Sequence, residues 1–285
     1  MRGATRLLQR LARTLLVVLL VVVGSTLLMR FAPGYLSDAR EMDARYAGAA
    51  RIELSAEAAR SGTLWQLLSN EMHAWTKGSL GLSRQYDVPV LQLIGPRLAV
   101  TGSLMLRSIV LAWTLALCAS LLSSAGRNPS MLWQAPAAVL LAVPTAAMAT
   151  LSLLAGSGGP VLVMTLLLAA RDFKFLDRTL RTAWRDPCLL QARAQGIPAL
   201  RLVRAHILPG IRPQLLALAT LSIVTALGAL VPVEVIFNVP GVGQLAWNAA
   251  MNRDLPVLLA VTMIMAIAVT LAGMTSDRSI DWQAA

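Results

Sequence analysis

Long apolar blocks alternate with polar segments along this chain, and most of the blocks are long enough to cross a membrane as helices. The first block runs without a charge from Thr14 to Met29. No small-residue cleavage pattern follows it, so we interpret it as a membrane span and not as a secretory signal peptide. The stretch 128–170 also lacks charges, but it is too long for one helix and is interrupted by a Gly- and Pro-rich sequence at 156–160. This stretch therefore predicts two spans that pack as a hairpin.

The pattern as a whole predicts an all-α polytopic membrane protein with six transmembrane helices. The expected spans are about 11–31, 98–122, 131–155, 160–176, 213–233 and 255–276. One long polar segment, 32–96, separates the first two spans. It contains six basic and seven acidic residues. Because it is nearly neutral, we place it on the outer side of the membrane, with a helix expected at 55–75.

The distribution of positive charge predicts the orientation of the chain. The formal net charge is +11, and short loops hold much of it, with four Lys and Arg residues in 1–13, one in 123–130 and nine in 171–212. Because basic loops stay in the cytoplasm, both termini and the loop 177–212 are expected there. The same rule explains the charge without a nucleic acid partner. Cys118 in a span and Cys188 in this loop would lie in different compartments, so no disulfide is expected.

The basic loop 177–212 predicts a short helix, then a turn. Asp186 followed by Pro187 is typical of a helix N-cap with proline at the first helical position. Gly196 is expected to end that helix in a conformation with positive φ.

A second short helix is expected to open at Pro198 and to end at 209–210. Leu200, Val203 and Ile207 would form its apolar stripe, with arginines beside it. The loop is thus predicted to be a helix-turn-helix at the membrane surface. On composition alone, a basic loop that only lies against lipid headgroups is an equal alternative.

Three charged residues fall within predicted spans. Arg107 interrupts the second span, where a charge is costly, so it is expected either to reach the membrane interface or to line a polar pathway within the helix bundle. Arg171 and Asp172 lie near the inner end of the fourth span. They are expected either to pair locally or to line a vestibule.

The loop also contains Ala-Arg-Ala-Gln-Gly at 192–196, followed by Leu-Pro at 208–209. This pattern resembles the cytoplasmic loop of ABC-importer permeases, in the form typical of the oligopeptide, dipeptide and nickel branch. The matching residues are Ala192, Arg193, Ala194, Gly196, Leu208 and Pro209, whereas Gln195 stands where the branch usually has lysine. The resemblance implies that this loop grips a cytoplasmic ATPase.

Two further passages resemble the same family. The first leads into the second span and matches at Gly78, Leu80, Gly81, Ser83, Pro89, Val90, Leu93, Ile94, Arg97 and Leu98. The second is an outer loop that matches at Glu234, Phe237, Pro240, Gly241, Gly243, Leu245, Arg253, Asp254, Pro256 and Val257. In this loop a turn and a short helix would dip back at the outer mouth of the pathway. The alternative for Glu234 is an interfacial carboxylate at a helix end.

The resemblance implies a type I ABC-importer permease bundle in the bacterial cytoplasmic (inner) membrane. Its implied partners are a second, related permease subunit in a heterodimer, two cytoplasmic ABC ATPase subunits and an extracytoplasmic solute-binding protein. Transport would proceed by alternating access. Peptides, nickel or metal chelates, and oligosaccharides all remain open as substrates.

Chemistry within the chain itself is not expected. It has no Walker-type phosphate loop, so ATP and Mg would be used by the partner subunits, and no cofactor, catalytic residue or metal site is predicted. Both histidines lie outside the spans, which argues against a membrane hydrolase. A self-contained secondary transporter would need ionisable residues at mid-membrane, and the uncharged spans have none. A structural or assembly membrane protein remains the other alternative.

Overall fold

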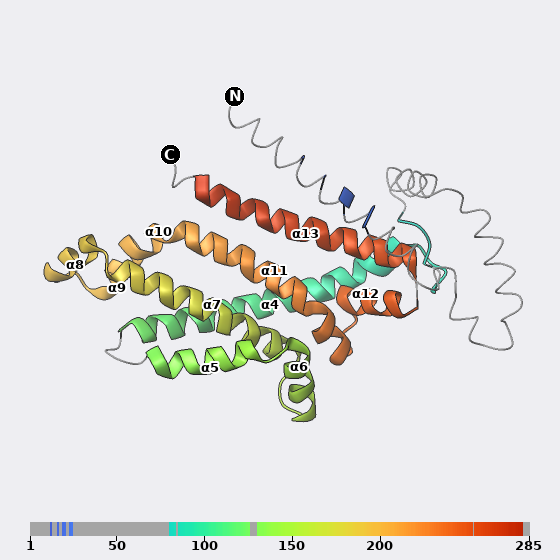
Figure 1. Ribbon diagram of the computed structural model, residues 1–285, viewed down its shortest axis with the longest axis horizontal. Coiled ribbons are helices and arrows are strands. Elements are labelled where there is room, and N and C mark those ends of the chain that lie inside the picture. Colours follow the sequence, from blue (N-terminus) through green and yellow to red (C-terminus); the bar gives the residue numbers. More distant parts are fainter. Residues whose placement is uncertain are drawn as a thin grey trace, which may run out of the picture. The chain divides into compact units, whose positions relative to one another are not determined.

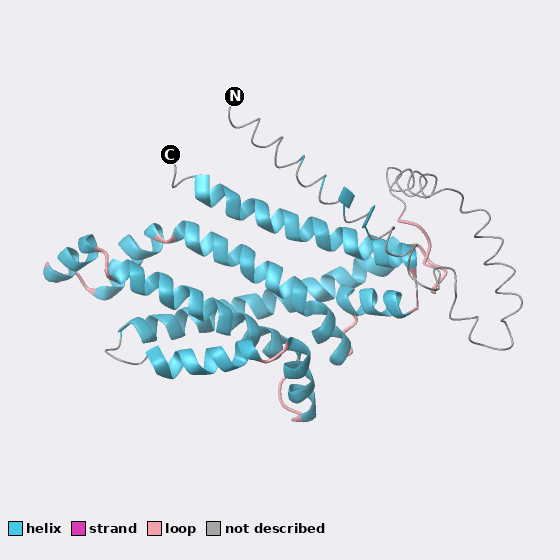
Figure 2. Cartoon of the chain, in the orientation of Figure 1, coloured by secondary structure: helices cyan, strands magenta, loops and turns pink. Residues whose placement is uncertain are grey.

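The computed structural model describes residues 80–83, 85–125, 130–252 and 254–281, together with positions 12, 16, 19, 20, 23 and 24. Within these ranges every named element is helical, apart from a single antiparallel bridge between Leu82 and Pro89 (Figures 1 and 2). The predicted helix at 55–75 lies outside the described residues. So does the predicted first span, except for the six scattered positions.

The helices follow one another without an intervening domain. They are α4 (Val90–Ala125), α5 (Ser130–Ala142), α6 (Thr145–Leu154), α7 (Pro160–Trp184), α8 (Pro187–Ala194), α9 (Ala199–Leu202), the π-helical turn η2 (Val203–Ile207), α10 (Leu208–Gly210), α11 (Arg212–Ile236), α12 (Val242–Met251) and α13 (Leu255–Asp281). Helix α4 begins at Val90, so 90–96, which we had assigned to the outer segment, is helical.

The chain divides into two compact units. The first comprises 1–101 and 240–270, and the second comprises 102–239 and 271–285. In the first unit the start of α4 packs against α12 and α13 around a core of buried side chains. This core consists of Val90, Ile94, Val242, Leu245, Ala249, Val257, Ala260 and Val261.

The second unit is built around α7, which packs against both α5 and α11 (Figure 1). Its central core contains small and large side chains from four helices, namely Ala116, Ala137, Ala170, Phe173, Leu176 and Leu218. Alanines on α4, α5 and α7 let the helices approach closely, as is common where helices associate in membranes.

Three described helices are long and apolar enough to cross a membrane, at 90–123, 212–236 and 256–273. A fourth is obtained if α5 and α6 count as one broken span. Charged residues interrupt the second half of α7, which therefore does not qualify by composition. The described chain thus contains three or four candidate spans, and the six-span bundle stays a prediction.

The predicted third span, 131–155, is not one straight helix. It is divided into α5 and α6, which are bent by 98° relative to each other. Pro144 lies at the bend with φ −58° and ψ 141°, an extended conformation that ends one helix before the next begins. Proline supplies no N–H and disfavours helical backbone at Val143 before it, which explains the break.

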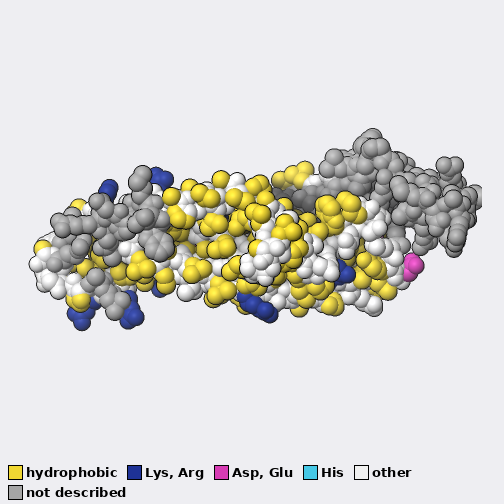
Figure 3. Space-filling view, turned by 90° about the horizontal axis from the view of Figure 1, so that it is seen from below, with side chains coloured by type: hydrophobic (Ala, Val, Ile, Leu, Met, Phe, Trp, Pro, Cys, Tyr) yellow, Lys and Arg dark blue, Asp and Glu magenta, His cyan; other side chains and the backbone are white. Residues whose placement is uncertain are grey.

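The surface of the described chain is largely apolar. On the face seen in Figure 3, hydrophobic side chains cover much of the described area. Most of the Lys and Arg side chains visible there lie at the end where Figure 1 shows α8 and α9. Large exposed side chains such as Leu106 on α4 and Leu154 on α6, at 66% and 79% exposure, suit contact with lipid or with another membrane subunit.

Candidate functional site

Residues 185–211 connect α7 to α11, and we call them the connecting segment. Asp186 caps α8, because its Oδ1 accepts the backbone N–H of Cys188 at 2.9 Å. Helix α8 ends at Ala194, and Gly196 follows with φ +80°. The cap and the glycine turn predicted from the sequence are therefore confirmed. A Cβ atom at Gly196 would meet no atom within 4 Å, so only its backbone conformation demands glycine.

The second half of the connecting segment contains a π-helical turn. The N–H of Leu208 bonds to the carbonyl oxygen of Val203, five residues earlier. Pro209 follows at once, and it has no N–H to give to the carbonyl four residues before it, against which its ring would also clash. A wider turn before the proline relieves this conflict. The helix ends at Gly210, with Ile211 as its C-cap residue, so the predicted end at 209–210 is confirmed.

The connecting segment has a core of its own. Its buried side chains are Leu180, Leu189, Leu202, Ile207 and Ile211. The predicted stripe of Leu200, Val203 and Ile207 is confirmed in part, because Ile207 belongs to this core and Val203 packs against it, and Leu202 is a further buried residue. Leu202 and Ile207 are buried and Val203 only partly, while the side chain of Leu200 is outside the description. The hydrogen bond across five residues adds one residue to this turn, which helps to bring Leu202 and Ile207, five positions apart, to the same core.

The residues that match the family pattern occupy the outside of this small fold. Ala192 packs partly against its core, and Leu208 is half-buried. Exposed positions are Ala194, Gln195, Gly196 and Pro209. Arg193 lies on α8, and its side chain is not among those described.

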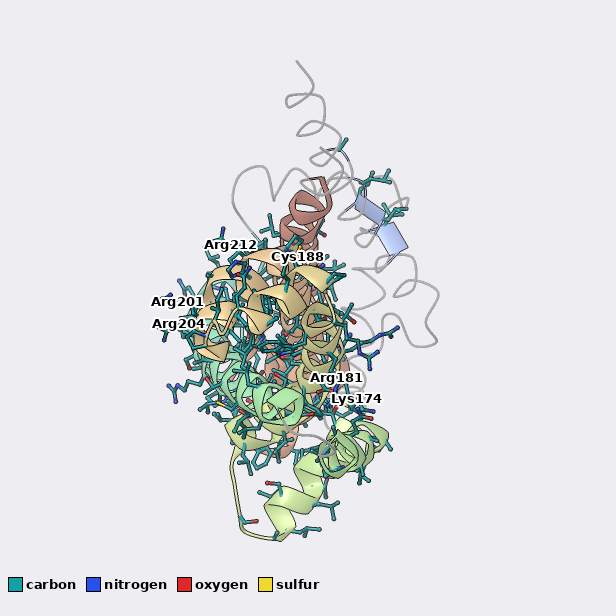
Figure 4. The ribbon with its side chains drawn as sticks, turned by 90° about the vertical axis from the view of Figure 1, so that its left-hand side faces the viewer. Lys174, Arg181, Cys188, Arg201, Arg204 and Arg212 are labelled. Atoms are coloured by element: carbon teal, nitrogen blue, oxygen red, sulfur yellow. The ribbon has the colours of Figure 1, made fainter. Side chains whose placement is uncertain are left out.

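Cations surround the same end of the molecule. Figure 4 shows Arg201 and Arg204 together on one side of this end, with Arg212 near them and Lys174 and Arg181 on another side. The connecting segment therefore exposes both its glycine turn and the side chains of Arg201 and Arg204.

The charges predicted near the pathway are placed differently from one another. Arg107 is exposed on α4, Arg171 is half-buried, and Asp172 is completely buried. The Oγ of Ser222 on α11 lies 3.0 Å from both carboxylate oxygens of Asp172. Trp113 on α4 donates its Nε1–H to the same Oγ at 3.1 Å. Asp172 therefore links helices inside the core and does not line an open vestibule in this chain.

A second buried carboxylate on α7 was missed by the sequence reasoning. Arg181 donates from Nε to both oxygens of Asp177, at 3.0 and 2.9 Å. Ser123 at the end of α4 donates to Asp177 at 2.8 Å, and Gln134 on α5 donates at 3.4 Å. The four-residue spacing of the acid and the arginine was the one signal available. The hydrogen bonds to Asp177 from Ser123 and Gln134 join α7 to α4 and to α5.

The predicted outer loop falls in both units, and each part is described separately. In the second unit, Glu234 is fully buried in α11, Phe237 follows the helix end, and Asn238 has φ +51°. The N–H of Val239 returns to the carbonyl oxygen of Glu234 at 2.8 Å and closes this end. Full burial excludes the alternative of an interfacial carboxylate for Glu234 within this chain.

In the first unit, the predicted short helix is confirmed as α12, but the prediction that Pro240 and Gly241 make a turn was wrong, because the turn lies earlier, at Phe237 and Asn238. Pro240 is exposed, and Gly241 adopts an extended conformation before α12. The Oγ1 of Thr101 accepts the N–H of Val242 at 2.8 Å, which satisfies a free amide at the start of α12. Gly243 is buried one residue later.

Asp254 at the end of this loop is buried. The sequence identified it as a residue of the outer loop but did not predict its hydrogen-bond partners. Ser83 donates its hydroxyl hydrogen to Oδ2 of Asp254, and the N–H of Gln85 reaches the same oxygen at 3.3 Å. Oδ1 is buried without a hydrogen-bond partner. The segment before α4 is thus tied to the start of α13. Across the described ranges, no three His, Cys, Asp or Glu residues gather closely enough to hold a metal ion.

Comparison with known proteins gives matches over most of the chain. A family model described as "Binding-protein-dependent transport system inner membrane component" matches residues 99–285. The chain is 26% identical over 286 residues to the glutathione transport system permease protein GsiC of Pectobacterium atrosepticum, covering 93% of this chain and 91% of that protein. It is 26% identical over 231 residues to a putative peptide permease protein of Brucella suis, covering 70% and 72%.

A shorter match has higher identity. The chain is 32% identical over 108 residues to the metal-staphylopine import system permease protein CntB of Staphylococcus aureus. That match covers 38% of this chain and 34% of the relative, so it spans about a third of the relative's length.

Proposed function

Because the chain belongs to the binding-protein-dependent transport system inner-membrane components, as an ABC-importer permease of the oligopeptide, dipeptide and nickel branch, we propose that it forms half of an ATP-driven import pathway. The other half is a second, related permease subunit with the same six-helix design. Two cytoplasmic ATPases bind and hydrolyse ATP with Mg, and an extracytoplasmic solute-binding protein delivers the solute. Both termini face the cytoplasm of a bacterium.

The connecting segment is the observation that carries this proposal. It exposes the turn at Gly196 while its own core holds it to α7 through Leu180 and to the approach of α11 through Ile211. A force applied to the turn is therefore delivered to two long helices at once. An element with an exposed tip and a packed base is what an external motor needs in order to move a membrane bundle.

Hydrogen bonds between α7 and α11 couple the two helices, so that we expect them to move together. Asp172 and Ser222 tie the two helices inside the core, and Trp113 ties α4 to the same point. These helices would therefore move as one body when the ATPases close. Rocking of this body against its counterpart in the second permease subunit would open the pathway first outward and then inward.

The substrate we propose is a peptide or a related solute such as a metal chelate. The relatives are named for glutathione, for peptides and for metal-staphylopine.

The test is reconstitution in liposomes with and without the partner subunits. The complete assembly should take up peptide only with ATP, and this chain alone should neither hydrolyse ATP nor move solute along an ion gradient. Uptake by the isolated chain under a proton or sodium gradient would instead establish a secondary transporter. Retention of full transport after removal of the ATPases would contradict the proposal in the same way.

Reversal of one charge tests the contact itself. Arg193→Glu should reduce co-purification of the ATPases and should uncouple their hydrolysis from uptake, because residue 193 lies on α8 three positions before the glycine turn that we expect to dock. Arg193→Lys keeps the charge and serves as the matched control. If Arg193→Glu assembles and transports like Arg193→Lys, the connecting segment is only a basic segment at the lipid surface.

A further inference from the structure

A partly open cavity of about 560 Å³ lies beside the connecting segment and belongs entirely to the second unit. Its walls come from the last turns of α7, from α8, η2 and α10, and from the first turn of α11. The π-turn contributes His206 and Ile207 to the wall. The floor is apolar, because Leu189, Ile207 and Ile211 are buried there.

The proposed topology places the cavity at the boundary between membrane and water. Gly210, Ile211 and Gln214 line it, and the apolar span of α11 begins at Arg212. The opposite wall comes from the charged half of α7, which includes Arg178. A molecule in this cavity would therefore have one side in the headgroup layer and the other against apolar side chains.

The polar groups of the cavity are of both signs. Arg178 and His206 are exposed in its wall, and so is the carboxylate of Asp186. Deeper in, the Oε1 of Gln214 is buried without a hydrogen-bond partner. A buried acceptor of this kind costs free energy until a donor reaches it.

Two threonines add further acceptors. The hydroxyl of Thr179 donates to the carbonyl oxygen of Phe175 at 2.9 Å, and that of Thr182 donates to Arg178 at 3.0 Å. Their hydrogens are used within α7, so toward the cavity each oxygen can only accept. The cavity thus offers one permanent cation together with several acceptors, one of them buried and unsatisfied.

We propose that this cavity binds the phosphoethanolamine headgroup of a phosphatidylethanolamine molecule from the inner leaflet. Arg178 holds the phosphate, with His206 beside it. The ammonium group brings three N–H donors, which suit Asp186, Gln214 and the threonine oxygens. The glycerol and the start of the acyl chains cover the apolar floor formed by Leu189 and Ile211.

Other common headgroups fit this set of groups less well. Phosphatidylcholine has the same two charges, but its trimethylammonium has no N–H and leaves Gln214 unsatisfied. Phosphatidylglycerol supplies the phosphate but places no cation near Asp186. The alternative of a lysine from a docked partner subunit would satisfy the acceptors and leave Arg178 without an anion.

The experiment measures which lipid stays bound to the purified permease assembly. The assembly is exchanged into equal amounts of phosphatidylethanolamine, phosphatidylcholine and phosphatidylglycerol with identical acyl chains, and bound lipid is counted by native mass spectrometry. Phosphatidylethanolamine should exceed each of the others by about tenfold, the ratio expected for one charged hydrogen bond. Equal retention of the three lipids would overturn the proposal.

Variants locate the site. Arg178→Gln should lower retention of all three lipids, and Lys174→Gln, an exposed cation on the same helix outside the cavity, should change nothing. Gln214→Met should remove the preference for phosphatidylethanolamine over phosphatidylcholine, whereas Gln214→Glu should increase it. Unchanged preference in both Gln214 variants would place the lipid elsewhere.

Two further experiments test whether the bound headgroup belongs to a membrane lipid or to a soluble molecule, and whether a partner subunit forms the site. Soluble glycerophosphoethanolamine should not displace the bound lipid, because it lacks the acyl chains that cover the floor. Displacement at equal concentration would show a site for a soluble amine and overturn the lipid assignment. Assembly without the ATPases should retain the lipid as well, and a preference that vanishes with their removal would show that a partner subunit forms the site.

Discussion

Ser83 donates its hydroxyl hydrogen to Asp254, although 171 residues separate the two along the chain. Both side chains are about 1% exposed. The N–H of Tyr86 in turn donates to the Oγ of Ser83 at 3.1 Å, so one hydroxyl orders the turn before α4 and attaches it to the start of α13. The described turn before α4 is thereby attached to Asp254 through a buried hydroxyl.

Removal of this anchor should weaken the first unit. Asp254→Ala leaves the hydroxyl of Ser83 without its acceptor inside the protein, and we expect a loss of roughly 1–3 kcal/mol in the free energy of unfolding. The measurement is the thermal denaturation midpoint of the purified assembly. Asp87→Asn is the control, because Asp87 is exposed in the same turn and asparagine tolerates its φ of +52°.

A double-mutant cycle separates the pair from its surroundings. Ser83→Ala and Asp254→Ala should together cost less than the sum of the two single changes, because each removes the same bond. Additive losses would show that the two residues stabilise the fold independently, contrary to their direct contact.

The turn at Gly196 should depend on backbone conformation and not on space. A residue with a Cβ pays about 1–2 kcal/mol in the left-handed region, and a β-branched one pays more. Gly196→Val should therefore lower co-purification of the ATPases and solute uptake, while the amount of membrane-inserted chain stays unchanged. Gly196→Asn should keep most of both activities, because asparagine adopts this conformation readily.

Gly228→Ala provides the matched control for the glycine turn, since Gly228 is exposed on α11 and has helical backbone and open space for a Cβ. It should behave like the parent. If Gly196→Val also behaves like the parent, the geometry of the turn has no part in coupling ATP hydrolysis to transport.

The contact between Asp177 and Arg181 should stabilise the second unit. Arg181→Met keeps the length of the side chain but leaves a carboxylate with 4% exposure without its cation. Because Arg181 is itself 34% exposed, solvent screens part of the interaction, and we expect a loss of about 1–3 kcal/mol. Thermal denaturation measures it, with Lys174→Gln as control. Equal midpoints for the two variants would mean that Ser123 and Gln134 suffice to hold the acid.

Labelling of the native Cys188 thiol should show on which side of the membrane the connecting segment lies. Cys188 is exposed, so after Cys118→Ala an impermeant maleimide should label it in inside-out vesicles and not in intact cells. A cysteine placed at Ala49, in the predicted outer segment, should label from the opposite side in a background without Cys188. Labelling of both positions in intact cells would contradict the proposed topology.

Features set by adjacent residues could be predicted from the sequence. The cap at Asp186 and the left-handed turn at Gly196 depend on side-chain reach and on a missing Cβ over a few residues, and both were found where expected. The buried polar contacts depend on packing instead. Asp172 and Ser222 are 50 residues apart, and Ser123 and Asp177 are 54 apart, so no local pattern links them.

Proline shows the same limit within single helices. Pro96, Pro136 and Pro232 all lie inside helices, whereas Pro144 separates two. Each of these prolines removes one backbone N–H donor, so the sequence alone does not distinguish a proline inside a helix from one that separates two helices. A helix can continue past a proline when neighbouring helices or side chains donate a hydrogen bond to the carbonyl oxygen that lost its N–H partner. Whether such a donor is present depends on the packing of the folded bundle.

The π-turn at 203–207 also bears on how this segment can change in length through evolution. It accommodates five residues where an α-helical turn would accommodate four. Loss of one residue between Val203 and Ile207 would convert it to an ordinary turn and keep the buried faces of Leu202 and Ile207 aligned, whereas a deletion in α11 would rotate everything beyond it. Single-residue gaps among relatives should therefore be tolerated here, and such gaps would narrow the cavity that this turn helps to form.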